Sequence, residues 1–436
     1  MMSLTTKPAK TAAEQPKTVA TRPKTIAKPA ATPDDRTDVV IVGAGPAGLF
    51  AALALHSAGL GAVIAAGPRR AGLDQRTSAL LDGSVKALAT LGVWPDIADQ
   101  AAPLRVMRLV DDTGRLIRAP LFEGRSDEIG LDAFGYNIAN ADLNAGLRAA
   151  VDRAGIPVVD EAVTSVAIGS EGVAATLVSG RILSARLVAG ADGRESIVRR
   201  TAGIETVETR YPQTAVTANF GHSRPHDDIS TEFHTRTGPF TLVPLPGQRS
   251  SLVCVVTPDD AARMLALDDA AFSREIERRS QAILGKVTVE PGRGRFDLSV
   301  VTPKRFGVFR AALIGEAAHV VPPIGAQGLN LGLRDGAALA DCLADVLASG
   351  ADIGGEAAMD AYDRARRADI VSRSLAIHAL NRSLLSDFMP VHGLRGLGLW
   401  LMDQVGPLRR AFMREGLQPG HAQPRLMRGE MPDHAA

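Results

Sequence analysis

The hydrophobic pattern is clearest between residues 39 and 68, a stretch that contains no Asp, Glu, Lys or Arg. Its β-branched run at residues 39–42 predicts a buried strand, the apolar residues 49–55 predict a helix, and residues 62–66 predict a second strand. A membrane span is the alternative, because about 20 apolar residues suffice to cross a bilayer. Glycine and proline divide the stretch between the predicted elements, which favours a strand–helix–strand unit of a folded domain.

The turn between the first predicted strand and the helix carries the pattern Gly-x-Gly-x-x-Gly, at Gly43, Gly45 and Gly48. In this context the pattern predicts a dinucleotide-binding turn. Gly43 would permit the tight turn, Gly45 would let the backbone approach a pyrophosphate, and Gly48 would let the helix pack against the strand. The helix N-terminus would offer N–H groups to the phosphates. A glycine turn without a ligand is the alternative, because short motifs also occur by chance.

The second predicted strand ends without the carboxylate that usually binds the adenosine ribose. Ala66 stands at its end, and Arg69 and Arg70 follow shortly after. Two interpretations remain open: the arginines bind the 2′-phosphate of NADP, or the ribose contact is weakened.

Two further motifs follow at the ends of apolar runs. Residues 187–191 lead into Asp192-Gly193, which taken alone would fit a turn with a capping aspartate. Residues 311–314 lead into Gly315-Glu316, a Pro/Gly-rich loop and a long predicted helix that contains Asp335, Asp341 and Asp345. Such a loop gathers backbone N–H groups and a helix N-terminus at one place, which suits a phosphate or a polarised ring.

These three motifs, in this order, resemble the class A flavoprotein aromatic hydroxylases. The similarity is closest to the ubiquinone-biosynthesis ring hydroxylases, which carry the string Gln-Gly-Leu-Asn-Leu-Gly-Leu-Arg-Asp found here at residues 327–335. Secondary similarities lie at residues 74–80, at Arg105 and at residues 238–245. The resemblance covers roughly residues 38–417.

The resemblance implies FAD as cofactor, NAD(P)H as co-substrate, and a role for individual residues. Gly43, Gly45 and Gly48 would receive the FAD pyrophosphate, with Arg76 near the same phosphates. Asp192 and Gly193 would serve both FAD and the incoming nicotinamide, and Glu316 would bind the ribityl hydroxyls. The loop under the isoalloxazine would consist of Gly325, Ala326, Gln327, Gly328, Leu329 and Asn330.

The chain departs from the family pattern at four places. Ala66 replaces the ribose carboxylate, and Glu316 replaces an aspartate. Gly325-Ala326 reverses the usual Ala-Gly order, and Pro322 stands where many relatives have histidine. The loss at Ala66 would forfeit a charge-assisted hydrogen bond of about 1.5–3 kcal/mol.

The resemblance also implies an α/β fold of the p-hydroxybenzoate-hydroxylase type. A Rossmann-like, dinucleotide-binding FAD domain would be interleaved with a β-sheet substrate domain and followed by a C-terminal helical region. We predict the FAD domain at residues 37–105, 150–204 and 296–345, and the substrate domain at 106–149 and 205–295. Within the substrate domain, the alternation of residues 214–220, 229–234, 240–243 and 251–256 predicts sheet strands. C-terminal helices are predicted at 346–420. The chain would begin with a disordered basic tail at 1–36 and end with a flexible tail at 421–436.

Composition restricts the remaining classes of function. A chain of 436 residues indicates two interlocked domains. A net charge of +1 and 4% aromatic residues argue against a nucleic-acid partner. Cys254 and Cys342 lie far apart, in no metal or redox spacing, so we expect small buried thiols in a reducing compartment and no metal site. We therefore expect a cytoplasmic enzyme.

The expected reaction is hydroxylation of the aromatic ring of a polyprenyl phenol in ubiquinone biosynthesis, with NAD(P)H and O2. Two alternatives stay open: a diverged, non-catalytic flavin-fold subunit of a quinone-biosynthesis assembly, and a hydroxylase of a soluble aromatic acid. No catalytic triad is required, because the cofactor supplies the chemistry. His319 is a candidate for a proton relay, and a structural histidine is the alternative.

The segment 384–417 is apolar but interrupted, and it includes Trp400 followed by Arg409, Arg410 and Arg414. Packing in the core is one interpretation. The other is peripheral contact with the inner membrane, which a polyprenyl substrate would favour.

Overall fold

The computed structural model describes residues 36–68, 75–114, 119–323, 325–385, 398, 404–417 and 423–432. The uncharged stretch at its start folds as predicted. Strand β1 (Arg36–Val42) leads into helix α1 (Pro46–Ser57), which returns to strand β2 (Ala62–Ala65). Among the described residues, no helix combines the length and the apolar character that crossing a bilayer requires.

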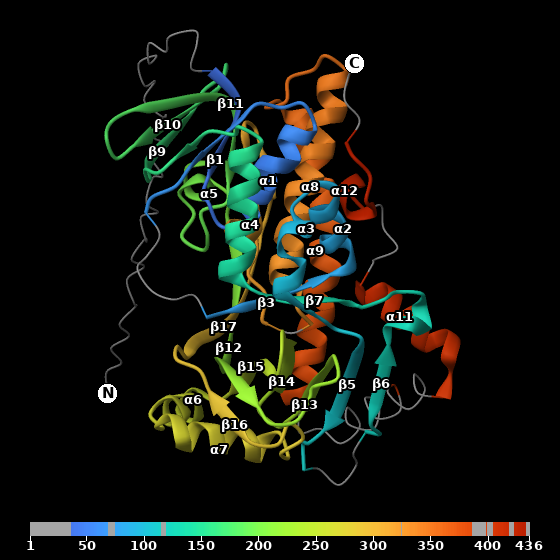
Figure 1. Cartoon of the computed structure of the whole chain (residues 1–436). Coiled ribbons are helices and arrows are strands. Elements are labelled where there is room, and N and C mark those ends of the chain that lie inside the picture. The colour runs from blue at the N-terminus through green and yellow to red at the C-terminus, as the bar shows by residue number, and fades with distance from the viewer. Residues whose placement is uncertain are drawn as a thin grey trace, which may run out of the picture.

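The first sheet is built around a parallel core (Figure 1). Its order is β18-β19-β11-β1-β2-β8, with β10 paired to β11 and β9 to β10. The pairs β19–β11, β11–β1, β1–β2 and β2–β8 are parallel. The additional strands are β8 (Val158–Val159), β9 (Val163–Ile168), β10 (Val173–Leu177), β11 (Ile182–Gly190), β18 (Gly307–Val308) and β19 (Ala311–Leu313).

Helices pack against this sheet and against each other to form the larger core. They are α4 (Asn140–Arg153), α5 (Ile197–Thr201), α8 (Gln327–Ala348) and α9 (Glu356–Leu385). Helix α1 contacts both α4 and α8. Helices α1 and α8 approach closely at Gly336, where an added Cβ would lie only 3.1 Å from the Cα of Ala51.

The second large sheet is mostly antiparallel and lies below the first in Figure 1. Its order is β16-β12-β15-β14-β13-β5-β6, with β17 also paired to β12. The predicted strands of the substrate region are confirmed at β12 (Thr206–His222), β13 (Ile229–His234), β14 (Pro239–Leu245) and β15 (Arg249–Val256). The other strands are β5 (Val106–Asp111), β6 (Phe122–Arg125), β16 (Val287–Val289) and β17 (Gly294–Pro303).

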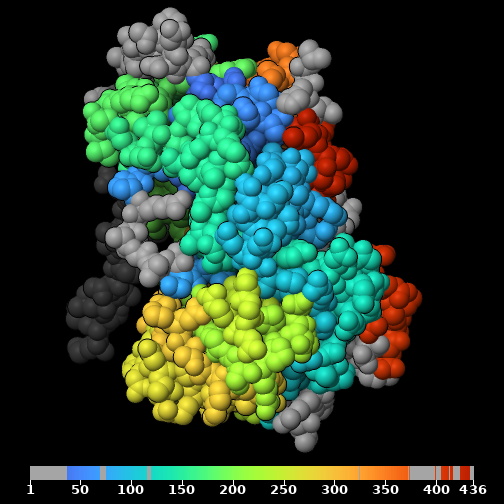
Figure 2. Space-filling view, in the orientation of Figure 1, coloured from blue at the N-terminus to red at the C-terminus, as the bar shows by residue number. Residues whose placement is uncertain are grey.

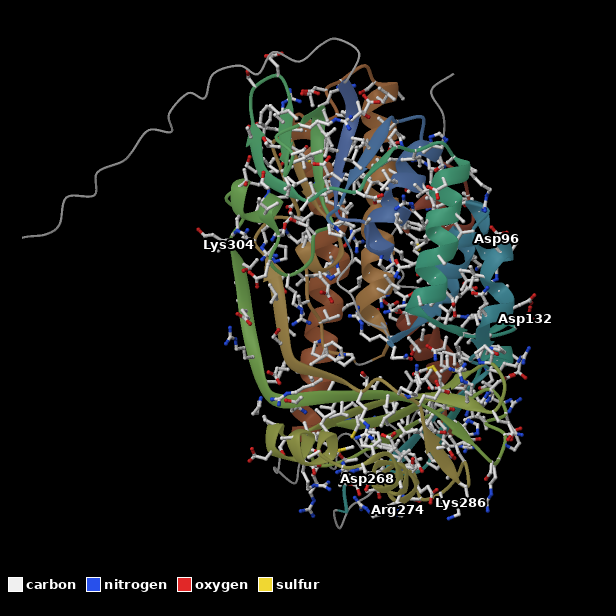
Figure 3. The ribbon with its side chains drawn as sticks, turned by 60° about the vertical axis from the view of Figure 1, so that its left-hand side comes forward. Asp96, Asp132, Asp268, Arg274, Lys286 and Lys304 are labelled. Atoms are coloured by element: carbon white, nitrogen blue, oxygen red, sulfur yellow. The ribbon has the colours of Figure 1, made fainter. Side chains whose placement is uncertain are left out.

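Strands β12 and β17 connect the two parts of the molecule. Figure 3 shows these long strands running from the level of Lys304, beside the first sheet, into the second sheet, where they bend. The register between them shifts between Arg210 and Thr214. Such an irregularity bends a strand and strengthens its twist.

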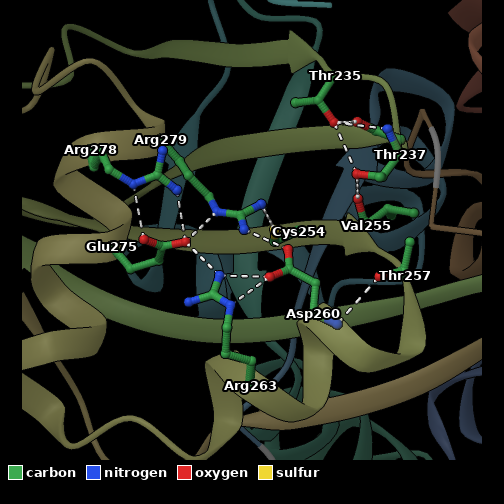
Figure 4. A network of polar contacts seen from close by, with 11 residues as sticks. Thr235, Thr237, Cys254, Val255, Thr257, Asp260, Arg263, Glu275, Arg278 and Arg279 are labelled. Carbon is green, nitrogen blue, oxygen red and sulfur yellow. Dashed lines mark hydrogen bonds and ion pairs between the residues drawn. The ribbon is translucent and has the colours of Figure 1, made fainter.

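Helices α6 (Pro258–Leu265) and α7 (Asp269–Arg279) cover the outer face of the second sheet. Arg263 and Arg279 each contact both Asp260 and Glu275, and Arg278 also contacts Glu275 (Figure 4). The hydrogen bond from Arg278 is the main reason that the pKa of Glu275 falls to about 2. These contacts tie the two helices together.

Cys254 lies beneath this pair of helices. Burial raises the pKa of its thiol to about 12. Burial has the same effect on Cys342, whose pKa also rises to about 12. Both thiols are therefore protonated and unreactive at neutral pH, as expected for cysteines that serve as small packing residues.

A third, small sheet joins the two parts, in the order β3-β7-β4. Its strands are β3 (Thr77–Leu81), β4 (Ala101–Pro103) and β7 (Gly135–Ala139), and the short helices α2 (Asp82–Thr90) and α3 (Trp94–Ile97) lie next to it. Asn137 of β7 donates to the carbonyl of Pro244 at 2.8 Å, which joins this sheet to the second one.

Two helices are described near the C-terminus. Helix α11 (Gly406–Leu417) lies beside β6, and its Met413 is buried next to Phe134. Helix α12 (Arg425–Arg428) lies in the segment predicted as a flexible tail, yet its Leu426 and Met427 are buried in the larger core. Of the tail predicted at 1–36, Arg36 belongs to β1, and residues 1–35 lie outside the described residues, as do the apolar residues around Trp400.

Candidate functional site

The predicted cofactor motifs meet at one edge of the first sheet. Val42 of β1 is in register with Gly190 of β11 and with Ala65 of β2, and Gly190 is in register with Leu313 of β19. Because these four strands are parallel, their carboxyl ends lie side by side. Ligands of open α/β sheets bind at this edge.

The glycine turn has the backbone that its sequence predicts. Gly43 has φ +114°, and a Cβ there would lie 2.3 Å from the carbonyl oxygen of Ala191. A Cβ at Gly48 would lie 2.1 Å from the carbonyl oxygen of Gly43. Both glycines are therefore required by close backbone packing, at the strand–turn junction and at the first turn of α1.

Gly45 differs from its two neighbours. It has ordinary extended angles, and a Cβ there would meet nothing within 4 Å. The fold itself thus does not require glycine at this position. Gly45 is the N-cap of α1, and no described side chain caps the first N–H groups of the helix. The open space at Gly45 and the uncapped helix N-terminus fit a pyrophosphate.

Asp192 accepts a hydrogen bond from the start of the short helix α5, whose N-cap residue is Ser196. Its Oδ2 accepts a hydrogen bond from the N–H of Ile197 at 2.7 Å, which agrees with the capping interpretation. Its Oδ1, however, is buried and has no hydrogen-bond partner among the described residues. An unpaired buried oxygen is rare, and a hydroxyl or an ordered water of the FAD site would satisfy it. Gly193 follows in the left-handed region, with φ +78°.

Glu316 lies next to the Asp-Gly turn, at the end of β19. Its side chain is 57% exposed and lies 3.6 Å from Arg194. The ion pair brings the second and third sequence motifs together. Both side chains are exposed, so the pair contributes little to stability. The carboxylate is accessible to a ligand hydroxyl.

The loop before α8 is held by two buried amides. Asn330 accepts hydrogen bonds from the N–H of Leu81 and from Ser84, and it donates to the carbonyls of Ala79 and Ala326. Gln327 donates to the carbonyl of Gly325 at 2.9 Å. Between these buried side chains, Gly325 and Gly328 remain exposed and Leu329 half-buried. The loop is thus held on its buried side by Gln327 and Asn330, and its other side is accessible to solvent.

The exchange of glycine and alanine in this loop has a structural consequence. Gly325 and Ala326 both adopt left-handed angles, with φ +65° and +56°. Alanine is strained there, at a cost of roughly 1–3 kcal/mol. Ala326 is the N-cap of α8, which no side chain caps. Pro322 is buried just before the loop, and Ile324 lies outside the described residues.

Two predicted contacts lie at the margins of this site. Ala66 follows β2 and its N–H donates to the carbonyl of Val159, so it stands at the expected edge without a carboxylate. Arg76 is exposed, and its guanidinium lies 5.8 Å from the ring centre of Phe296. Arg69 and Arg70 lie outside the described residues.

His319 is 2% exposed and is held by a carboxylate. Its Nε2 lies 2.8 Å from Oδ2 of Asp335. Burial would raise the pKa of Asp335, but His319 and Arg366 outweigh that effect and lower it below the ordinary value. The geometry favours a structural role for His319.

Sequence reasoning missed a set of buried charges on α9. Arg366, Asp369 and Arg373 are each less than 10% exposed, and they contact α8. Their spacing of three and four residues places them on one helix face. That spacing was the available signal, but charge on a helix usually indicates a solvated face.

The inner face of the second sheet turns toward this site. Asn219 of β12 donates to the carbonyl of Gln75, next to Arg76. Ala215, four residues earlier on the same strand, forms an apolar cluster with Val255 and Leu298, bordered by Tyr211 and Phe296. Figure 2 shows the surface hollowed between the green and blue upper part and the yellow lower part. An apolar ring would find a matching wall here.

Comparison with known proteins shows the family of the chain. Residues 36–374 match the family model described as FAD binding domain. The chain is 36% identical to the ubiquinone hydroxylase UbiL of Rhodospirillum rubrum, over 91% of this chain and 94% of the relative. It is 28% identical to the 3-demethoxyubiquinol 3-hydroxylase of Escherichia coli, over 87% of this chain and 98% of the relative.

A solved structure shows the same fold. Klebsiella pneumoniae HpxO, complexed with FAD and uric acid, superposes with a TM-score of 0.69 at 19% identity, over 88% of this chain and 97% of that one. The predicted fold class and FAD cofactor are confirmed. The chain belongs to the FAD binding domain family and, within it, to the flavoprotein aromatic hydroxylases that include the ubiquinone hydroxylases.

Proposed function

We propose that this protein is an FAD-dependent monooxygenase that hydroxylates the aromatic ring of a polyprenyl phenol in ubiquinone biosynthesis, using NAD(P)H and O2. The observation that carries the proposal is the 36% identity to UbiL along almost the whole length of both chains. The cofactor edge supports it, because the three main motifs follow the carboxyl ends of the neighbouring parallel strands β1, β11 and β19.

In this proposal each set of residues at the cofactor edge binds a different part of FAD. Gly45 and the α1 N-terminus hold the pyrophosphate, and Glu316 holds the ribityl hydroxyls. Residues 325–330 support the isoalloxazine, and Asp192 and Gly193 serve FAD and the nicotinamide. Bound FAD would take electrons from NAD(P)H and activate O2, while the protein orients the ring and excludes water.

The substrate ring is proposed to lie between residues 325–330 and the inner face of the second sheet. The apolar cluster at Ala215, Val255 and Leu298 would pack against the ring and exclude water.

Peripheral membrane contact is the proposed route to a polyprenyl substrate. Four exposed apolar side chains lie around α11 and the β5–β6 hairpin, and we name them the α11 apolar surface: Met107, Leu121, Val405 and Leu408. Met413 packs the helix onto Gly124 of β6. Arg410 and Arg414 are exposed on the same helix, where they could meet anionic headgroups.

The decisive experiment combines quinone analysis with purified enzyme. A strain that lacks the gene should accumulate an under-hydroxylated quinone precursor, and this gene should restore the quinone. Purified protein should then consume NAD(P)H and O2 and hydroxylate that precursor, but not a phenol without the tail. Equal activity on an aromatic acid that lacks the polyprenyl tail would instead favour a soluble aromatic substrate.

Two observations favour a second candidate, a non-catalytic subunit of a quinone-biosynthesis assembly. The strain at Ala326 and the missing carboxylate at Ala66 both weaken the expected FAD site. This candidate would be supported if the gene restores the quinone in the deletion strain although the purified protein contains no FAD. The colour of the purified protein distinguishes the two.

A further inference from the structure

Helices α8 and α9 share a group of buried charged side chains, which we name the α8–α9 charge network: Arg334, Asp335, Arg366, Asp369 and Arg373. All five residues are less than 10% exposed. Burying charges costs free energy unless they are paired and hydrogen-bonded. Apolar residues of similar volume would pack two helices together equally well, so helix packing alone does not explain five charges.

Asp369 is the centre of the network. Its carboxylate accepts hydrogen bonds at 2.9 Å from Arg334, Arg366 and Arg373. Burial would raise its pKa, but Arg366 and Arg334 outweigh that effect and lower it. Arg366 extends the network to Asp335 through a hydrogen bond of 2.7 Å.

One end of the network holds the loop that carries Glu316. Oδ2 of Asp335 accepts a hydrogen bond from the N–H of Gly315 at 2.9 Å. Gly315 is in the left-handed region, with φ +61°, and it directly precedes Glu316. The position of the Glu316 backbone is thus tied to α8.

The other end holds the loop before α8. Arg373 donates to Oε1 of Gln327 at 2.7 Å, and Gln327 donates to the carbonyl of Gly325 at 2.9 Å. Arg373 therefore acts on the backbone of Gly325 through one intermediate side chain. The two loops proposed to hold the ribityl chain and the isoalloxazine are joined through α9.

We propose that the α8–α9 charge network positions the two cofactor loops relative to each other, and that Arg373 is a positioning residue for the flavin through Gln327. The proposal rests on the FAD site assigned above. It predicts that removing Arg373 changes how the flavin is held, while the fold remains. Asp369 would still be paired with Arg334 and Arg366.

The test compares Arg373→Met with Arg367→Met, a matched control on the same helix. Arg367 pairs with Asp363 and is 45% exposed, away from Gln327. Both variants are measured without substrate, by FAD titration of the apoprotein, by the visible absorption and circular dichroism of bound FAD, and by its midpoint potential. Thermal unfolding of each apoprotein reports the fold.

Arg373→Met is expected to weaken FAD binding roughly tenfold, the scale of one charge-assisted hydrogen bond. It should also change the visible dichroism and the potential, while the control changes neither. Gln327→Met should reproduce these effects, and the double variant should add nothing further, because both act through one contact.

An unchanged flavin spectrum, potential and affinity in Arg373→Met would overturn the proposal, as would additive effects in the double variant. If Arg373→Met does not fold, Arg373→Lys decides, because it keeps the positive charge beside Asp369 but lacks the second guanidinium nitrogen that donates to Gln327. No substrate is present, so failure to hydroxylate a polyprenyl phenol would overturn only the proposed function. Normal FAD binding by Gly45→Leu would overturn the site assignment.

Discussion

Nε2 of His319 and Oδ2 of Asp335 lie 2.8 Å apart, and neither side chain is accessible to solvent. The same carboxylate accepts the N–H of Gly315 and pairs with Arg366. His319 is thus part of the support beneath the cofactor edge rather than a group in contact with solvent or substrate. Two predictions follow from this pair.

The first concerns His319 as a proton relay. His319→Gln keeps an N–H donor for Asp335, and we expect the pH profile of kcat to keep its shape. Chemical denaturation should show a loss of about 1–3 kcal/mol, the typical cost of disturbing a buried hydrogen bond to a charge. Disappearance of one ionisation from the profile would show that His319 transfers a proton.

The second concerns Asp335 and pH. Its pKa is lowered in the folded protein, so its stabilising effect is complete above the unfolded pKa near 4 and is lost as the pH falls further. Asp335→Asn should cost about 3–5 kcal/mol at pH 7, because it removes one partner of a buried pair. Urea denaturation at pH 7 and at pH 3 should show this difference shrinking at the lower pH. A difference that stays constant would contradict the shift.

The glycine turn predicts two opposite outcomes from two similar substitutions. Gly45→Leu enters open space and should leave the apoprotein stable but colourless, because the side chain fills the proposed pyrophosphate position. Gly43→Ala meets the carbonyl of Ala191 at a positive φ and should cost at least about 2 kcal/mol of stability. Flavin absorbance and thermal unfolding are measured on both variants. The absorbance reports whether the pyrophosphate position is filled, and the unfolding temperature reports the backbone strain. A yellow, FAD-saturated Gly45→Leu would place the pyrophosphate elsewhere.

Glu316 is predicted to be a ligand rather than a stabilising residue. Its only described ion pair, with Arg194, is exposed and contributes less than about 1 kcal/mol. Glu316→Ala should therefore lose FAD without loss of fold, and Glu316→Asp should retain or improve FAD content. The measurement is FAD per protein after purification and reconstitution. Arg194→Ala is the control: if it alone removes FAD, the carboxylate is not the ligand.

The α11 apolar surface predicts reversible, salt-sensitive membrane binding. Full-length protein should float with liposomes that contain anionic lipid, and flotation should fall with added salt. The double variant Leu121→Glu/Leu408→Glu should float less. Ile182→Glu, a similarly exposed apolar residue on β11, is the control and should float like the natural protein. Equal flotation of all three would move the contact to another surface.

The sequence predicted the elements whose signal is local. Gly43 and Gly48 mark the turn, and the β-branched runs mark β1 and β2, because close backbone packing restricts the residue types there. The four predicted strands from β12 to β15 follow from alternation in the same way. Family resemblance, and not periodicity, supplied the cofactor.

The contacts that hold the cofactor edge from behind could not be predicted in this way. Asn330 reaches Leu81 and Ser84, and Arg373 reaches Gln327, across large sequence separations that no local pattern records. Buried charge on α9 has the same spacing as a solvated helix face. Only the packing of α9 against α8 shows which side of the helix is inside.

The order of strands in the first sheet affects how the chain folds during its translation. Strand β1 is translated first but lies in the sheet between β2 and β11, and β11 pairs on its other side with β19. At ribosomal rates of 5–20 residues per second, roughly 15 to 60 s would pass before α8, which packs against α1, emerges. During that time the uncharged stretch 39–68 lacks its final neighbours. The nascent chain should therefore depend on chaperones, and slower translation should lower its yield.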